Sequence, residues 1–89
     1  MFKAAYQGTV GDSSEEAIVR FFQGVEIKPV ACTTLEEVVS RVENREVEYG
    51  FIPTENQNLI KKQNLYKIYE YAHPKNHNIF AIFRIKEGY

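Results

Sequence analysis

Residues 47–57 read VEYGFIPTENQ and decide the fold that we predict for this chain. The apolar run that ends at Ile52 is almost continuous, which is typical of a strand buried on both faces. Pro53 cannot donate a hydrogen bond to a continuing ladder, so we expect a strand over residues 47–53. The polar loop that follows, Thr54 to Gln57, then lies beyond the carboxyl end of a central strand. Open α/β sheets hold their ligands at that place.

The chain before this strand has the pattern of two strand–helix pairs. Residues 2–6 resemble a short strand, and a turn with two glycines follows at residues 7–12. Ser13 and Glu16 have the spacing of a capping box, which predicts a helix that begins at Ser13 and is ended by Gly24. Its apolar stripe falls at residues 17, 18, 21 and 22.

The second pair repeats this arrangement. Residues 26–31 predict a strand, and Pro29 places it at an edge of the sheet. Thr34 and Glu37 form another capping-box pattern, and the apolar residues at 35, 38, 39 and 42 predict a helix that Asn44 ends.

Strands joined by helical crossovers lie parallel, and we predict the order 2-1-3 for these three. The Gly8–Gly11 turn and the loop at residues 54–57 would then border one crevice. Residues 58–64 are too few and too polar for a core helix. Residues 65–71 and 77–85 predict two further strands that extend the sheet as a hairpin. The predicted fold is an α/β single lobe with a β-α-β-α-β parallel core.

The composition excludes several classes of protein. With 89 residues and a formal net charge of -1, the chain is one small domain without the basic face that a nucleic-acid-binding protein requires. It has no apolar run of membrane-spanning length and no secretory signal, so we expect no membrane association and a cytoplasmic location. Cys32 is the one cysteine, and with His73 and His77 it makes only a weak set of metal ligands. We expect no metal, and hydrogen-bonded or solvated histidines.

Three blocks of sequence, in the same order, resemble the first lobe of prephenate dehydratase. They are the glycine turn leading into Ser14-Glu15-Glu16-Ala17, the segment from Cys32 to Val39 with Val42-Glu43-Asn44, and the segment from Tyr49 to Asn56. The resemblance implies that residues 1–89 form a single lobe like that of a periplasmic binding protein. It also implies an enzyme that removes water and carbon dioxide from prephenate to give phenylpyruvate, on the route to phenylalanine, without a metal or organic cofactor.

The chain also departs from this family. The family's catalytic domain has two lobes, and 89 residues suffice for about one. Gln57 stands where the family has serine, and the threonine-arginine-phenylalanine motif has no match. If residues 77–80 correspond to that motif, Asn78 replaces the threonine and Ile79 the arginine. Alternatively, these residues correspond to the strand that crosses into the second lobe.

The candidate binding residues lie at the two predicted strand ends, and we expect a small-molecule carboxylate there. They are Gly8, Gly11, Ser14, Glu55, Asn56 and Gln57. Each also has a purely structural interpretation: glycines make tight turns, Asx-type side chains cap turns, and serines cap helices. By plain spacing Ser13 fits a helix cap, whereas Ser14 aligns with the family's serine.

Two functions follow from these patterns. The first is a prephenate dehydratase lobe that is inactive alone and requires a second lobe or partner chain. The second is a homo-oligomer that works as a non-catalytic binding or regulatory module. The tyrosines near the carboxyl end favour the second, with core packing expected of Tyr66 and an association face of Tyr69 and Tyr71.

Overall fold

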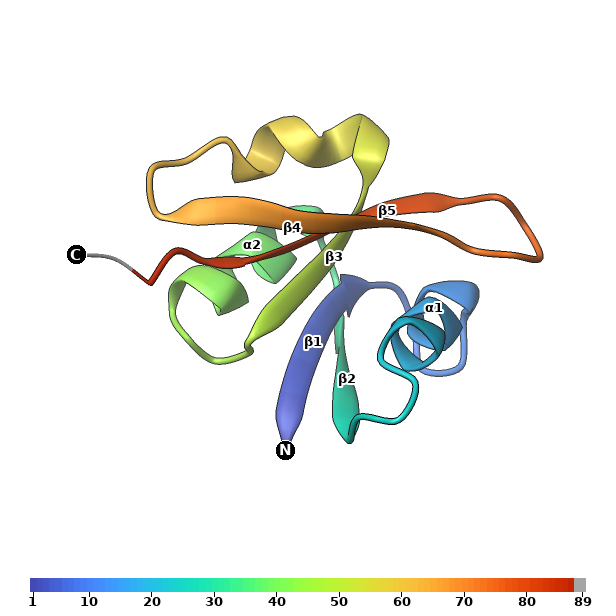
Figure 1. Cartoon of the computed structure of the whole chain (residues 1–89). Coiled ribbons are helices and arrows are strands. Elements are labelled where there is room, and N and C mark those ends of the chain that lie inside the picture. The colour runs from blue at the N-terminus through green and yellow to red at the C-terminus, as the bar shows by residue number, and fades with distance from the viewer. Residues whose placement is uncertain (88–89) are drawn as a thin grey trace.

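Five strands form one mixed sheet in the order β2-β1-β3-β5-β4. The computed structural model describes residues 1–87. β1 (Phe2–Gln7) pairs in parallel with β2 (Ile27–Cys32) on one side and with β3 (Tyr49–Pro53) on the other. The predicted order 2-1-3 is therefore confirmed, and β2, which contains Pro29, is an edge strand. β5 (Ile79–Ile85) pairs antiparallel with β3, and β4 (Leu65–Ala72) forms the far edge (Figure 1).

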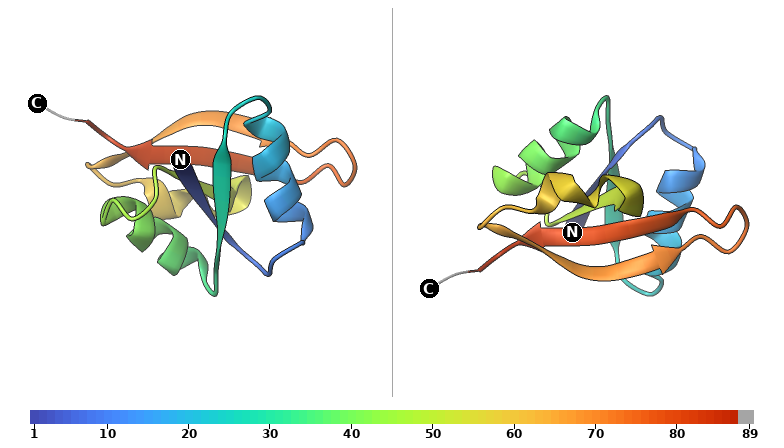
Figure 2. Two further views of the ribbon diagram at one scale, coloured as in Figure 1. Left: turned by 90° about the horizontal axis from the view of Figure 1, so that it is seen from below. Right: turned by 90° about the horizontal axis from the view of Figure 1, so that it is seen from above.

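Helices cover both faces of this sheet, and each face has its own core (Figure 2). Residues of α2 (Leu35–Glu43) pack with Ala5, Ile52 and Phe83, which are fully buried. Residues of α1 (Ser13–Phe21) pack against the opposite face, with Tyr6 and Phe51. Side chains alternate between faces along a strand, so consecutive residues of β1 and β3 serve different cores. This explains why residues 49–53 are apolar almost without interruption.

The amino-terminal cap of α1 is Asp12, not Ser13. Its carboxylate accepts hydrogen bonds from the backbone N–H groups of Ser14 and Glu15, at 2.9 and 3.2 Å. An aspartate is as good a cap as a serine, so the capping-box spacing misplaced the cap by one residue. This helix also ends earlier than Gly24, because its last residue is Phe21.

The cap predicted for α2 is confirmed. Thr34 accepts a hydrogen bond from the N–H of Glu37 through its side-chain hydroxyl, at 3.0 Å, and the helix is capped at its carboxyl end by Asn44. The Glu37 carboxylate accepts from the N–H of Thr33, one residue before the position that a regular capping box would use.

The predicted loop after Pro53 is a 3₁₀ helix, η1 (Thr54–Ile60). β3 begins at Tyr49 rather than at Val47, although the Val47 side chain is buried in the core under α2. Although its composition is polar, η1 also contributes to the core, because its last residue, Ile60, is 6% exposed and belongs to the core under α2. Only the first residues of η1 therefore remain available for a ligand at the carboxyl end of β3.

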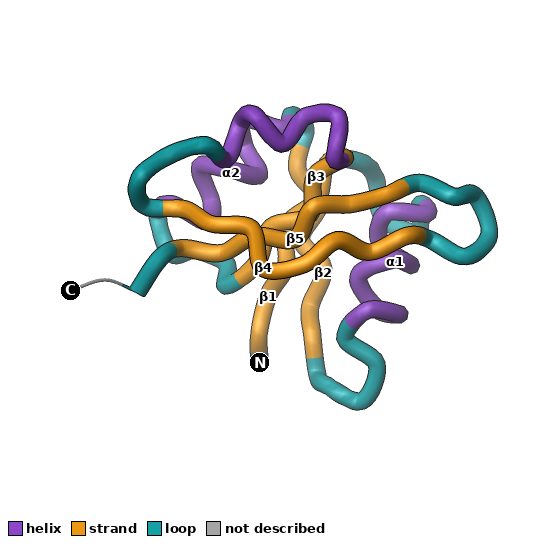
Figure 3. The backbone as a smooth tube through the Cα atoms, turned by 45° about the horizontal axis from the view of Figure 1, so that its top comes forward, coloured by secondary structure: helices purple, strands orange, loops and turns teal. Residues whose placement is uncertain are grey.

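The hairpin predicted for the last two strands is confirmed (Figure 3). Its strand β4 contains a bulge at Ile68, because Lys67 is paired with Phe83 while Tyr69 is paired with the preceding residue of β5, Ile82. Tyr66 is 41% exposed and is not a core residue, contrary to expectation. Within residues 1–87, no helix has the length and apolar character needed to cross a membrane.

Candidate functional site

A groove of about 440 Å³ opens where β1, β3 and β5 meet at one rim of the sheet. Parallel strands β1 and β3 end side by side there, and β5, which runs the other way, begins there. The predicted juxtaposition of the two strand ends is therefore present. Its lining residues are Gln7, Ser14, Pro53, Thr54, Glu55, His77, Asn78, Ile79 and Phe80.

Two of the six predicted binding residues line this groove. Ser14 reaches it from the first turn of α1, and Glu55 from the first turn of η1. Gly8 lines a neighbouring hollow beside Cys32 instead, and Gly11 lines neither. The structure thus brings together one residue from each predicted strand end.

The remaining two predicted residues lie on η1 away from the groove lining. Asn56 is partly buried, and Gln57 accepts a hydrogen bond from the ammonium group of Lys67, at 3.2 Å. The 3₁₀ helix accounts for this result. A loop could have directed four consecutive side chains at one site, whereas a helix distributes them around its axis.

Backbone N–H groups of the glycine turn donate hydrogen bonds to nearby carboxylates of the chain itself. The Asp12 carboxylate accepts from the N–H of Thr9 at 3.1 Å, in addition to its two bonds to α1. The Glu15 carboxylate accepts from the N–H of Gly11 at 3.3 Å. An anion in this turn would have to displace these carboxylates, so the turn acts as a support for the start of α1.

Tyr6 reinforces this support from the core. Its hydroxyl lies 2.9 Å from the Glu15 carboxylate and 3.0 Å from the carbonyl oxygen of Thr9, and it is the donor to either acceptor. Burial, followed by the hydrogen bond to Glu15, raises the pKa of Tyr6 well above its usual range. The phenol therefore stays protonated and cannot act as a base.

The opposite wall of the groove consists of residues from the β4–β5 turn and the start of β5, which the sequence did not single out as binding residues. His77 has a positive φ of 62°, uncommon for a residue other than glycine, and lines the groove beside Asn78. The one available signal was the alignment that set Asn78 against the family's catalytic threonine.

His73 attaches this turn to α1. The imidazole is 1% exposed, its Nδ1 accepts from the N–H of Lys75 at 3.1 Å, and its Nε2 lies 3.2 Å from the Glu16 carboxylate. Because Nδ1 is an acceptor, Nε2 carries the hydrogen that Glu16 accepts. The expectation of a hydrogen-bonded histidine is confirmed for His73, and this contact holds the two walls of the groove together.

Arg20 and Lys75 also bind Glu16, at 3.1 and 3.4 Å. The hydrogen bond from Arg20, followed by those from His73 and Lys75, lowers the pKa of Glu16. Within residues 1–87, no three histidine, cysteine or acidic side chains gather as metal ligands would.

Comparison with models of protein families shows the family to which this chain belongs. The family model of prephenate dehydratase matches residues 4–82. The chain belongs to the prephenate dehydratase family. The resemblance of the three sequence blocks is thereby confirmed, and the match extends through β4 and into β5.

Solved structures give the same fold for this prephenate dehydratase lobe. A chain titled GqqA, a novel type of quorum quenching acylase, superposes with a TM-score of 0.79 at 20% identity, over 98% of this chain and 49% of that chain. Prephenate dehydratase from Streptococcus mutans superposes with a TM-score of 0.68 at 16% identity, over 100% of this chain and 52% of that one. The lobe therefore spans about half the length of each. No curated protein matches its sequence.

Proposed function

We propose that the groove binds a small organic carboxylate, and that the chain takes part in converting prephenate to phenylpyruvate when a second lobe closes the groove. The family match from Ala4 to Ile82 supports the reaction class. The observation that carries the site is the convergence of Ser14, Glu55 and Asn78, from three separate segments, at one rim. We place this activity in the cytoplasm, in keeping with the free thiol of Cys32.

The proposed reaction requires a group that can donate a proton, and it releases carbon dioxide and water. The bond from the ring to its carboxylate breaks, the released electron pair makes the ring aromatic, and the ring hydroxyl departs with a proton as water. A hydrogen-bond donor must therefore face the departing hydroxyl. Ser14, Thr54 and His77 are donors of this kind along the groove.

Charge determines how a carboxylate would lie. His77 is the one basic side chain among the lining residues of the groove, and Glu55 is the one acidic side chain. A carboxylate is repelled by Glu55, whereas the His77 imidazole and the Asn78 amide each offer it an N–H donor. We therefore place the ligand carboxylate against the β4–β5 turn and its hydroxyl toward α1 and η1.

The groove on its own leaves a ligand in contact with water. Eight of its nine lining residues are half-buried or exposed, and only Phe80 is buried. Expelling water strengthens the electrostatic contacts on which such a reaction depends. A second lobe, from the same protein or from a partner, would provide that closure.

The site can be tested with phenylpyruvate, the stable product, titrated into the isotope-labelled chain and followed by amide chemical shifts. The expected shifts centre on Ser14, Glu55 and Asn78. His77→Asn keeps a residue that tolerates positive φ and removes the imidazole, so affinity should fall about tenfold, the equivalent of ~1.4 kcal/mol. Lys61→Gln, an exposed change outside the groove lining, is the matched control. Absence of shifts along the groove would refute the site.

A second candidate function is self-association through the free edge of β4, as a binding or regulatory module. Tyr69 is 59% exposed on this strand, next to the partly exposed Ile68. Because the bulge at Ile68 shifts the alternation of side chains, Lys67 and Glu70 lie on the same face of β4 and form an ion pair. A second copy, paired antiparallel about the middle of β4, would place Lys67 opposite Glu70 of the partner subunit.

Charge reversal tests this candidate. Lys67→Glu and Glu70→Lys should each be monomeric by sedimentation, because like charges then face each other across the interface. An equimolar mixture of the two variants should associate again, since each reversed charge meets its opposite. Monomers for the unaltered chain at all concentrations would contradict self-association, and so would a mixture that stays monomeric.

A further inference from the structure

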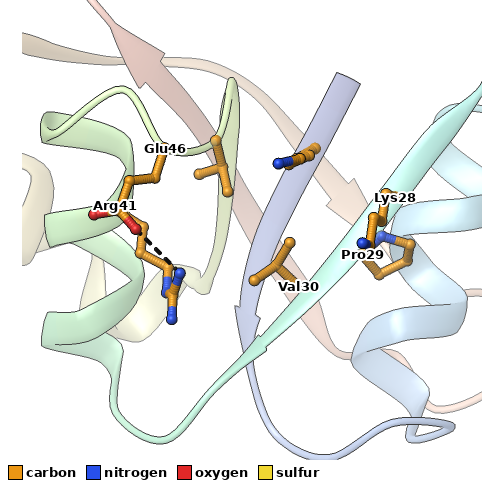
Figure 4. A pocket seen from close by; sticks show the side chains of 7 residues that line it. Lys28, Pro29, Val30, Arg41 and Glu46 are labelled. Atoms are coloured by element: carbon orange, nitrogen blue, oxygen red, sulfur yellow. Dashed lines mark hydrogen bonds and ion pairs between the residues drawn. The ribbon is translucent and has the colours of Figure 1, made fainter. Parts of the chain in front are cut away.

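A second hollow, of about 490 Å³, lies on the α2 face of the sheet near the amino ends of β1 and β2. Figure 4 shows Arg41 and Glu46 on the α2 side of the hollow, and Lys28, Pro29 and Val30 on the β2 side. The groove described above lies at the carboxyl ends of β1 and β3, so the two sites are separate.

Two lysines face the hollow from neighbouring strands. Lys3 on β1 and Lys28 on β2 are direct partners in the parallel register. Both project on the α2 face, because Ala5 and Val30, two residues further along each strand, belong to the core that α2 covers. Like charges on directly opposite residues destabilise a sheet, and this pair therefore favours a ligand that neutralises it.

Three carboxylates around the hollow, those of Glu37, Glu46 and Glu48, already have other partners. Arg41 binds Glu37 at 3.0 Å and Glu46 at 3.1 Å. The Glu48 carboxylate accepts a hydrogen bond from the backbone N–H of Lys3 at 2.8 Å. Within residues 1–87, neither lysine ammonium group has an acidic partner within ion-pair distance.

The rest of the lining consists of the Arg41–Glu46 ion pair and three apolar residues, Pro29, Val30 and Val47. Pro29 and Val30 are half-buried and supply the accessible apolar surface, whereas Val47 is 3% exposed. An inorganic ion would use only the two ammonium groups and leave this apolar surface uncovered. A molecule with an anionic head and an apolar body would use both parts of the hollow.

We propose that this hollow binds a small organic anion, whose carboxylate or phosphate group bridges Lys3 and Lys28 and whose apolar body covers Pro29 and Val30. The site is independent of the groove and of the reaction proposed for it. Occupying it would tie β1 to β2 near the amino ends of both strands.

Thermal unfolding with phenyl phosphate as the probe tests this site. The double variant Lys3→Gln/Lys28→Gln should unfold at a higher temperature than the unaltered chain in low salt, because the repulsion between the lysines is gone. Phenyl phosphate should raise the Tm of the unaltered chain and leave that of the double variant unchanged. Lys61→Gln, a lysine outside the hollow, should respond to the probe like the unaltered chain.

Three further arms identify the ligand chemistry. Phenylacetate in place of phenyl phosphate tells a carboxylate head group from a phosphate, and inorganic phosphate measures the contribution of the apolar body. Sodium chloride at equal ionic strength should give no comparable rise. Amide shifts at Lys3, Lys28, Val30 and Val47 would locate the probe in the hollow. A Tm rise that chloride reproduces, or that the double variant retains, would overturn the proposal.

Discussion

Gly50 shows how closely the middle of this sheet is packed. A Cβ atom built on Gly50 would overlap the ring of Phe83, and it would lie 3.0 Å from a methyl carbon of Val42. Both neighbours are fully buried, so neither can move away without disturbing the core under α2. Glycine is required here by the close approach of a side chain and not by its backbone conformation.

We predict that Gly50→Ala lowers the free energy of unfolding by about 1–3 kcal/mol, the usual cost of overpacking a core. Urea denaturation followed by circular dichroism measures this change. Adding Phe83→Leu should recover part of the loss, because the smaller side chain makes room for the new methyl group. If the double variant is less stable than the sum of the two single changes predicts, the clash is not the cause.

Glu16 predicts how stability depends on pH. Its pKa in the folded chain is below the usual 4.5, chiefly through Arg20, and then through His73 and Lys75. A carboxylate with a lowered pKa contributes stability above its unfolded-state pKa, and this contribution is lost as the pH falls through the folded-state pKa. Glu16→Gln should therefore flatten the fall in stability below about pH 4.5, as measured by urea unfolding at a series of pH values. An unchanged pH profile would show that other carboxylates dominate the acid transition.

At the scale of elements, substitutions of the two helix caps can distinguish an effect on stability from an effect on the geometry of the groove. Asp12 caps α1 and also holds the Thr9 N–H, whereas Thr34 caps α2, which lies outside the groove lining. Removal of a cap costs about 0.5–2 kcal/mol. The two helices thus offer a pair of cap substitutions, of which only Asp12→Ala lies next to Ser14.

We predict that Asp12→Ala and Thr34→Ala lower the free energy of unfolding by similar amounts, but that only Asp12→Ala weakens phenylpyruvate binding. The reason is that Asp12 fixes the turn of α1 that brings Ser14 to the groove. Calorimetric titration at a temperature where both variants are folded measures the binding. Equal loss of affinity in both variants would mean that general loosening, and not the position of Ser14, accounts for it.

The elements also show which features could be predicted from the sequence. The strand that ends at Pro53 and the edge strand that contains Pro29 were predictable, because proline restricts a sheet in a definite way. The 3₁₀ helix after Pro53 was not predictable, because residues 54–57 suit a turn equally well. The buried residue of this helix is Ile60, its last residue, which lies outside that stretch. The cap at Asp12 was missed for a related reason, since Asp12 and Ser13 are both good caps and adjacent.

Two residues of the candidate groove, His77 and Asn78, could not be predicted as binding residues from the sequence either. Ser14 and Glu55 follow predicted strand ends, so the parallel order was enough to place them together. His77 and Asn78 come from a hairpin turn, and nothing local in their sequence indicates that β5 lies next to β3. That neighbourhood is a long-range property of the sheet, which only the complete topology provides.

At the scale of the whole molecule, the open groove limits what the chain can do alone. We predict no measurable turnover of prephenate by the isolated chain at high concentration, with formation of phenylpyruvate followed by absorbance, because water reaches the ligand from the uncovered side. Turnover that appears only when a separate second-lobe protein is added would support a split enzyme. Turnover by the chain alone would show that one wall is sufficient and would contradict the requirement for closure.

The position of the β4–β5 turn has a consequence for engineering. His77 and Asn78 border the groove, whereas the amino terminus lies on another side of the molecule (Figure 1). Pro74, Lys75 and Asn76 are exposed, and exposed loop tips tolerate inserted polypeptide. A folded module spliced between Pro74 and Asn76 would thus arrive directly over the mouth of the groove, and both of its connections would pass beside the bound molecule. A fusion to the amino terminus would start from another side of the molecule.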